Sequence, residues 1–483
     1  MSIKKYFRCR SVESLIEESE KSKGLTRSLG AFQLVMLGIG AIIGAGIFVF
    51  TGAAAGQHAG PGIMLSFALA GFACACVALC YAELASMIPV AGSSYTYAYS
   101  SLGELPAWII ACMIMMTYCL GAASVASGWS GYVQSFLHDY GYHLPEVLTA
   151  PFGTTIIKDG VETTTLFNLP AMLIVMLVTF VVFRGSQTSA WVNSVIVFIK
   201  MSVLLAFVAL GSTKIDPANW SPLVPENTGV FGEFGWSGII SGASLVFLAY
   251  TGFDAVATAA QETKDPKKDL PIGIIGSLII CIVVYMLVSA VLTGIVPYKE
   301  LNVAEPMAIA VDRMGMPWFA AVIKIGAIAG LTTVVLVLTY GAVRILYAVT
   351  HDGLLPKALA KTHSKTHTPH VLTMIVGGVI AVLSSILSVD KLVKLANFGT
   401  LITFTIVCIG TIYLRYKKPN INREFRCPMV PAIPLLGIAL LISILCGLPL
   451  EIFMYAGIWT AAMLVVYFLY GSKHSHLLNP RLK

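Results

Sequence analysis

Apolar segments about twenty residues long recur along almost the whole sequence, and no other feature limits the fold as strongly. About 20 residues of helix are needed to cross a ~30 Å hydrocarbon core, so each segment is a candidate membrane span. Only 11% of the 483 residues are charged, against roughly 25% in ordinary soluble domains. The candidate spans are residues 29–50, 61–84, 106–134, 167–183, 190–211, 236–260, 272–296, 318–348, 370–388, 394–414, 430–447 and 451–470.

These segments predict an all-α polytopic membrane protein with twelve transmembrane helices in one membrane domain, residues 29–470. The weak ten-residue alternation of a membrane β-barrel is absent from the sequence. Residues 1–28 are charged and rich in glutamate, unlike a cleavable signal peptide, so we expect them to stay on the side where they are made. Residues 471–483 form a short tail.

Lysine and arginine are unevenly distributed between the predicted loops. With the N-terminus inside and twelve crossings, 23 of the 31 Lys and Arg residues fall in inner segments and 6 in outer loops. Because these residues accumulate on the cytoplasmic side, both termini are predicted to be cytoplasmic, in a plasma (inner) membrane protein. The formal net charge of +7 then reflects topology, and no nucleic-acid partner is expected.

Two of the spans are interrupted by glycine. The first contains GAIIGAGIF, residues 40–48, and the sixth contains FLAYTGFDAV, residues 247–256. Because five helices separate the two interruptions, corresponding helices cross in opposite directions, as an inverted repeat requires. Paired interruptions of this kind point to the binding site of a transporter. The predicted parts are repeat 1 at about 29–211, repeat 2 at about 236–414, and two extra C-terminal helices at 430–470.

The interruptions suit a zwitterionic ligand. Glycine costs about 1 kcal/mol relative to alanine inside a helix, so Gly40, Gly44 and Gly46 lower the cost of unwinding. An unwound backbone is tolerated in a bilayer only where it is buried in protein or lines a wet cavity. Free N–H groups at the start of a half-helix favour an anion, and free carbonyl groups at its end favour a cation. The expected partners are the N–H groups of Gly44, Ala45 and Gly46 for a carboxylate, and the carbonyl groups near Ile42, Phe247 and Tyr250 for an ammonium.

A second interpretation of the first interruption is that Gly40-x-x-x-Gly44 is a small-residue face for helix packing, a common membrane motif. A dinucleotide fingerprint is excluded because no strand precedes the glycines. Asp254 in the second interruption favours the binding site, since an intramembrane carboxylate usually faces a cavity or a partner. Gly40, Gly252 and Asp254 are therefore expected to support the two breaks.

Lys200 lies in the middle of the fifth span. It is about ten residues from either end, which is roughly 15 Å from each membrane surface. Burial disfavours its charged form, so Lys200 suits the binding and release of a coupling proton. The alternative is a permanently charged lysine that holds neighbouring carbonyl groups. Lys324 lies near the outer end of its span, where we expect it to extend to the interface.

Long strings in the sequence resemble the amino acid-polyamine-organocation superfamily, and most closely its cationic amino acid transporter branch. They are GAIIGAGIFV, then AGPGIMLSFALAGFACACVALCYAELASMIPVAGSSYTYAYSSLGE, GWSGY, FLAYTGFDAVATAAQETKDPKKDLP and GAVRILYAVTHDGLLP. The resemblance implies a five-plus-five inverted repeat of the leucine-transporter type with two extra helices. It also implies a secondary active transporter that moves an amino acid by alternating access.

The resemblance carries roles over to individual residues. Lys200 matches the lysine that, in proton-coupled relatives, occupies the region where sodium-coupled relatives bind sodium, which favours proton symport. The residues implied in binding the amino acid are Ile42, Ile43, Gly44, Ala45 and Gly46 in the first span, and Phe247, Leu248, Ala249 and Tyr250 in the sixth.

The third span departs from the cationic branch. That branch typically reads WDLILEY where residues 112–118 of this chain read CMIMMTY, so the usual acidic positions are Met113 and Thr117. A carboxylate is the sensible partner for a cationic side chain, and Thr117 cannot supply that charge. Leu248 replaces a usual aromatic residue. We therefore predict a neutral amino acid as substrate, with uptake of arginine or lysine, or exchange of an amino acid for a polyamine, as the alternatives.

Other classes of protein fit less well. A channel would need a continuous polar pore or repeated filter loops, and a membrane enzyme would need clustered His, Asp or Cys at one depth. Two groups of residues could indicate a metal site. One is Cys74, Cys76 and Cys80 in a span, and the other is His363, His367 and His370 in a loop. Packing and solvation are the preferred interpretations, so neither a metal nor a cofactor is expected. The expected partners are the amino acid, a proton and the lipid bilayer.

Overall fold

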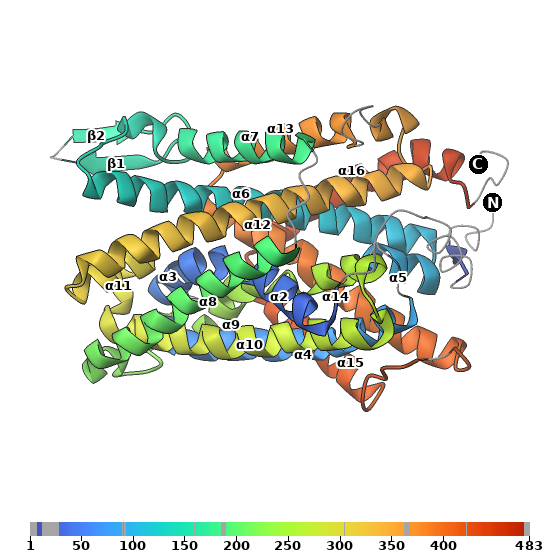
Figure 1. Cartoon of the computed structure of the whole chain (residues 1–483), viewed down its shortest axis with the longest axis horizontal. Helices are drawn as coiled ribbons and strands as arrows, with labels where there is room; N and C mark the ends of the chain where they lie inside the picture. The colour runs from blue at the N-terminus through green and yellow to red at the C-terminus, as the bar shows by residue number, and fades with distance from the viewer. Residues whose placement is uncertain are drawn as a thin grey trace.

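Long helices lying side by side along the longest axis make up most of the protein (Figure 1). The computed structural model describes residues 7–11, 29–88, 90, 93–158, 161–184, 190–303, 305–361, 368–421 and 423–477. Arg10 and His476, in the first and last described segments of the chain, both contact Asp352, so these two segments meet at one end of the molecule. We call this the terminal end.

The first half of the chain contains the following elements. They are α2 (Ala31–Ile42), the π-helix η2 (Gly46–Phe50), α3 (Thr51–Ala54), η3 (Ala55–Ala59), η4 (Gly60–Gly62), α4 (Ile63–Met87), α5 (Ser93–Ser101), α6 (Glu104–Asp139), η5 (Glu146–Leu148), β1 (Thr155–Lys158), β2 (Val161–Thr164), α7 (Leu169–Arg184), α8 (Ala190–Gly211), η6 (Ser212–Lys214) and η7 (Pro217–Trp220).

The second half continues in the same way. Its elements are α9 (Gly235–Val246), the 3-10 helices η8 (Phe247–Tyr250) and η9 (Phe253–Glu262), α10 (Pro266–Ile295), η10 (Tyr298–Glu300), α11 (Pro306–Arg313), α12 (Pro317–His351), η11 (Lys357–Ala360), α13 (His370–Ile386), α14 (Val389–Lys417), α15 (Ala432–Cys446), α16 (Leu450–Val466), η12 (Tyr467–Gly471) and α17 (Ser472–His474).

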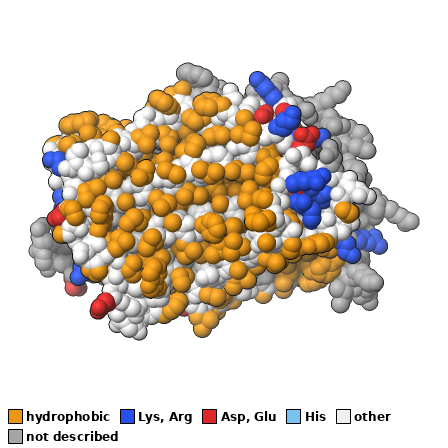
Figure 2. All heavy atoms as spheres, turned by 90° about the horizontal axis from the view of Figure 1, so that it is seen from below, with side chains coloured by type: hydrophobic (Ala, Val, Ile, Leu, Met, Phe, Trp, Pro, Cys, Tyr) orange, Lys and Arg blue, Asp and Glu red, His pale blue; other side chains and the backbone are white. Residues whose placement is uncertain are grey.

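The surface of the protein matches a lipid environment. Figure 2 shows hydrophobic side chains across the middle of one face, with Lys and Arg gathered toward the terminal end. Phe180, Phe198 and Leu450 are exposed, whereas the polar Lys200 and Asn397 are buried. Within the described residues, eight helical stretches are long and apolar enough to cross a membrane. This arrangement confirms an all-α polytopic membrane protein.

Helices distant in the sequence pack as pairs. α4 packs against α10, α6 against α12, and α7 against α13, the last pair along one edge of the molecule (Figure 1). α6 also packs on α14, and α2 packs on α10. The two interrupted helices are therefore enclosed by long continuous ones.

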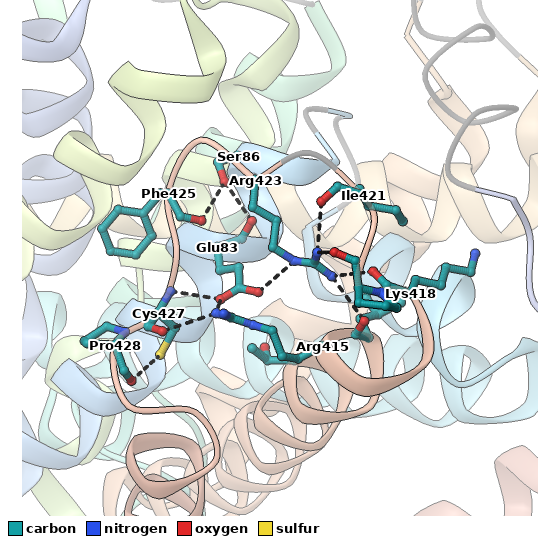
Figure 3. Close-up of polar contacts among 12 residues, drawn as sticks. Glu83, Ser86, Arg415, Lys418, Ile421, Arg423, Phe425, Cys427 and Pro428 are labelled. Carbon is teal, nitrogen blue, oxygen red and sulfur yellow. Dashed lines mark hydrogen bonds and ion pairs between the residues drawn. The ribbon is translucent and has the colours of Figure 1, made fainter.

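A buried ion cluster joins two helices and a loop at the terminal end (Figure 3). The Glu83 carboxylate on α4 lies 3.1 Å from Nε of Arg423, pairs with Arg415 of α14, and accepts a 2.8 Å hydrogen bond from the N–H of Cys427. The Arg423 guanidinium also donates to the carbonyl groups of Leu414 and Lys418 at the end of α14. The loop after α14 is therefore fixed to both helices.

Several features differ from the sequence-based expectations. The prediction for Lys324 was wrong, because its side chain is buried and its Nζ lies 2.6 Å from Asp139 at the end of α6. The antiparallel hairpin β1–β2 was not predicted and lies between the spans expected at 106–134 and 167–183. Among the described residues, which include Cys74, Cys76, Cys80 and His370, no group of three or more His, Cys, Asp or Glu could hold a metal ion. His363 and His367 lie outside the described residues.

Candidate functional site

The first membrane helix is interrupted at the predicted glycines. α2 ends at Ile42, Ile43 is extended (φ −72°, ψ 105°), and helical structure resumes at Gly46 as the π-turn η2. A Cβ at Gly44 would lie 2.7 Å from a methyl group of Val334, so α12 packs directly against the break. Gly40 is buried one half-turn before the end of α2.

The second interruption meets the first one. α9 gives way to the 3-10 helix η8, and the chain turns at Thr251 and Gly252 before η9 begins. A Cβ at Gly46 would lie 2.1 Å from the Cβ of Ala249, so the two broken helices touch where a side chain cannot fit. Gly252 has φ +133°, a conformation that favours glycine, and packs on the carbonyl group of Ala41.

Asp254 supports the second break. Its Oδ1 accepts a 3.0 Å hydrogen bond from the N–H of Gly252, and its Oδ2 accepts one of 3.3 Å from the Tyr118 hydroxyl group. A carboxylate that satisfies N–H groups at the start of a helix stabilises that start. The structure therefore gives Asp254 a local role at the turn, with its carboxylate bonded inside the protein.

Tyr285 of α10 connects both breaks. Its hydroxyl group lies 2.8 Å from the carbonyl oxygen of Ile42 and 3.2 Å from that of Ala249. One hydroxyl proton can serve only one of these acceptors at a time. One carbonyl lone-pair site at the breaks is therefore left for another donor.

Two backbone N–H groups without a backbone partner follow the first break. Within the described part of the chain, the N–H groups of Gly44 and Ala45 have no backbone partner, because both residues lie between the end of α2 and the start of η2. The carbonyl oxygen of Ile43 instead accepts from Lys200. The break thus presents N–H groups and carbonyl groups on successive peptide units, as a zwitterion requires.

A cavity lies between the two breaks and α6 and α12. Counting the part that opens to solvent, it holds about 380 Å³ of empty space. The residues that line it carry no charge. They are Ala41, Ile42, Gly44, Ala45, Gly46, Phe50, Thr117, Gly121, Val125, Leu248, Ala249, Thr251, Val334 and Leu338.

Most of the predicted binding residues line this cavity, but Ile43, Phe247 and Tyr250 do not. The Tyr250 hydroxyl group donates instead to the carbonyl oxygen of Phe67 (2.9 Å). The Phe247 ring packs against Phe404 at a centroid distance of 6.0 Å. Roles for these three residues in binding substrate stay predictions.

Thr117 presents an acceptor to the cavity. Its hydroxyl group donates to the carbonyl oxygen of Ala396 (3.0 Å) and lies 3.3 Å from the Thr400 hydroxyl group. Its proton is therefore held by α14. At the position where the cationic branch has a carboxylate, this chain has the uncharged hydroxyl oxygen of Thr117.

Lys200 reaches the first break from α8. Its Nζ donates to the carbonyl oxygen of Ile43 (3.3 Å) and to Oγ1 of Thr333 on α12 (2.8 Å). The side chain is buried, and no carboxylate among the described residues lies within ion-pair distance of it. A buried ammonium without a counter-ion is costly, which favours a group able to release its proton.

Sequence reasoning missed Tyr285, Thr333 and Thr251. Tyr285 is a tyrosine in the middle of an apolar span, where its hydroxyl group needs a buried partner, and this signal could have identified it. Thr333 and Thr251 gave no comparable signal. A threonine in a membrane helix can satisfy its hydroxyl group on its own backbone, so the type alone indicates nothing.

The sequence is similar to known proteins over most of its length. Residues 29–469 match the family model described as "Amino acid permease". The chain is 45% identical to the branched-chain amino acid permease BcaP of Bacillus subtilis (strain 168), over 98% of each chain. It is 44% identical to the methylthioribose transporter of the same organism, over 98% of this chain and 99% of that one. It is 39% identical to the chloroplastic cationic amino acid transporter 9 of Arabidopsis thaliana, over 83% of this chain and 69% of that one.

Proposed function

The chain belongs to the amino acid permease family, and from this membership we propose that its substrate is a neutral aliphatic amino acid. The observation that carries the proposal is the uncharged cavity between the two breaks. The N–H groups of Gly44 and Ala45, which have no backbone partner among the described residues, suit the α-carboxylate. The other lining groups of α6 and α12, which include Val125, Val334 and Leu338, suit a branched apolar side chain.

The relatives point to the same substrate class. The chain is similar over its whole length to a permease named for branched-chain amino acids, and more distantly to transporters named for cationic ones. A cationic side chain would be buried in this cavity without a counter-ion, at high cost. Among the described residues, Thr117 and Thr251 are the only ones with polar side chains that line it.

We further propose that Lys200 couples transport to a proton. When protonated, Lys200 holds the Ile43 carbonyl group of the first break to Thr333 of α12. Loss of the proton removes positive charge from this contact and weakens it, since hydrogen bonds to charged groups are the stronger ones. The first broken helix is then free to move relative to α8 and α12, as alternating access requires.

The proposed topology has twelve crossings, with both termini in the cytoplasm and the terminal end facing it. The eight long apolar stretches include one, Ala31–Met87, that is long enough for two crossings, and three shorter apolar helices complete the set. The packing of α4 on α10, α6 on α12 and α7 on α13 supports the inverted repeat, because each pair joins helices at equivalent positions of the two halves.

Uptake into proteoliposomes tests the substrate. Radiolabelled leucine should accumulate in vesicles that contain the purified protein, faster with an inward proton gradient. Unlabelled isoleucine and valine should compete, whereas arginine should not. Arginine that outcompetes the neutral amino acids would refute the proposal.

Methylthioribose belongs in the same competition series, because one relative of 44% identity is named for it. A sugar needs several hydroxyl partners, and the cavity offers only Thr117 and Thr251, with the Thr117 proton held by Ala396. We therefore expect no competition by methylthioribose. If methylthioribose competes and leucine does not, the substrate is this sugar and the proposal of an amino acid is refuted.

A further inference from the structure

Thr251 lies in the turn between η8 and η9 with an unsatisfied hydroxyl group. The residue is 8% exposed, and among the described residues its Oγ1 has no hydrogen-bond partner. Its backbone is fixed by a 3.1 Å hydrogen bond from its N–H to the carbonyl oxygen of Leu248. Buried polar groups in proteins are nearly always hydrogen-bonded, so an orphaned hydroxyl group at this position indicates a missing partner.

The missing partner fits in the cavity, because Thr251 is one of the residues that line it. Thr251 lies toward the α2 side of the first break: a Cβ at the next residue, Gly252, would lie 2.8 Å from the carbonyl oxygen of Ala41. The free N–H groups of Gly44 and Ala45 belong to the other side of the break. The hydroxyl group is therefore beside the carbonyl-bearing end, where a cation is favoured.

Hydrogen-bond counting gives the same result. The carbonyl groups of Ile42 and Ala249 share one proton from Tyr285, which leaves one acceptor for a ligand. A primary ammonium group has three donors and needs more than one acceptor. The lone pairs of the Thr251 hydroxyl group are a further acceptor at this end of the cavity.

We infer that Oγ1 of Thr251 accepts a hydrogen bond from the α-ammonium group of the bound amino acid. This assignment rests on the proposed transport of a neutral amino acid. Thr251 is then a substrate-binding residue that serves the common part of all amino acids, while the apolar residues of α6 and α12 contact the variable part.

The test compares two ligands on the full-length purified protein. Leucine carries both charged groups, whereas leucinamide keeps the ammonium and lacks the carboxylate. Calorimetry, or competition against radiolabelled leucine, gives the Kd of each ligand for the wild type and for Thr251→Val. Because no group in the described part of the chain bonds to Oγ1, valine at this position leaves no partner unsatisfied there, and the ligand-free variant should be as stable as the wild type.

Thr251→Val should raise the Kd of both ligands by a similar factor, roughly 10- to 100-fold, as expected for the loss of a hydrogen bond to a charged group. Thr251→Ser should restore binding to within a few-fold. The matched control is Thr339→Val, since Thr339 on α12 also has a buried Oγ1 without a partner among the described residues but does not line the cavity. Its Kd values should equal those of the wild type.

Three outcomes would overturn the inference. An unchanged leucine Kd in Thr251→Val would refute it and leave the proposed function intact. A loss for leucine but not for leucinamide would place the hydroxyl group at the carboxylate instead. If the wild-type protein binds no leucine, the proposed function is refuted, and so is the inference that Thr251 binds the α-ammonium group.

Discussion

Replacing Glu83 by glutamine should destabilise the protein strongly. The Glu83 side chain is 2% exposed, and the side chain of its partner Arg423 is 3% exposed (Figure 3). Glutamine still offers an oxygen to the N–H of Cys427, so this hydrogen bond can persist. What Glu83→Gln removes is the negative charge beside a buried guanidinium group.

The expected loss is about 3 kcal/mol of the free energy of unfolding. Removing one partner of a buried ion pair costs about 3–5 kcal/mol. The low end applies because Arg423 keeps its carbonyl partners, which include Leu414 and Lys418. Arg423→Gln should cost at least as much, because it removes the charge and the donors to these carbonyl groups together.

The matched control is Glu300→Gln, which breaks the 2.7 Å pair with Arg313. Both of these side chains are well exposed, 52% and 42%, so the expected loss is below about 1 kcal/mol. Unfolding in mixed micelles with increasing dodecyl sulfate can be followed with a thiol-reactive dye, since all ten cysteines are free and eight are buried. Equal losses in Glu83→Gln and Glu300→Gln would refute the buried cluster.

Three further predictions concern the breaks, the proton and pH. Lys200→Ala should abolish the dependence of leucine uptake on the pH gradient and spare leucine exchange; unchanged pH dependence would remove Lys200 from coupling. Gly46→Ala should lower leucine binding at least 100-fold, because its Cβ would lie 2.1 Å from that of Ala249, whereas Gly378→Ala, which meets no atom within 4 Å, should bind normally. Burial raises the pKa of Glu305, in the loop before α11, from 4.5 to about 7. The native state then binds more protons than the unfolded chain between these values, so stability falls as pH rises through this window, and unfolding midpoints at pH 5 and 8 should differ less in Glu305→Gln.

The sequence predicted the interruptions well because their causes are local. Clustered glycines at 40–46, and Gly252 two residues before Asp254, mark places where a helix is easily broken, and the structure breaks both helices there. The five helices between the breaks indicated an inverted repeat, in which the two breaks form one site. Gly46 and Ala249 are in contact, although about 200 residues separate them.

The partners of the breaks could not be predicted because tertiary packing selects them. Tyr285 reaches Ile42 from a helix 243 positions later, and Thr333 reaches Lys200 across 133 positions. The sequence around Tyr285 or Thr333 does not indicate which helix packs against that residue. The burial of Lys324 has the same origin, since Asp139 arrives from the end of a different helix.

The proposed proton site and the proposed carboxylate site share one peptide unit. The carbonyl oxygen of Ile43 accepts from Lys200, and the N–H of Gly44 has no backbone partner among the described residues. Both groups belong to the same planar amide. A charged donor on the oxygen polarises that amide and makes its N–H a stronger donor. Protonation of Lys200 should therefore tighten carboxylate binding, and by linkage a bound amino acid should favour protonated Lys200 to the same extent. The break at residues 43 and 44 can thus couple proton and substrate through the backbone itself, with no side-chain contact between Lys200 and the amino acid.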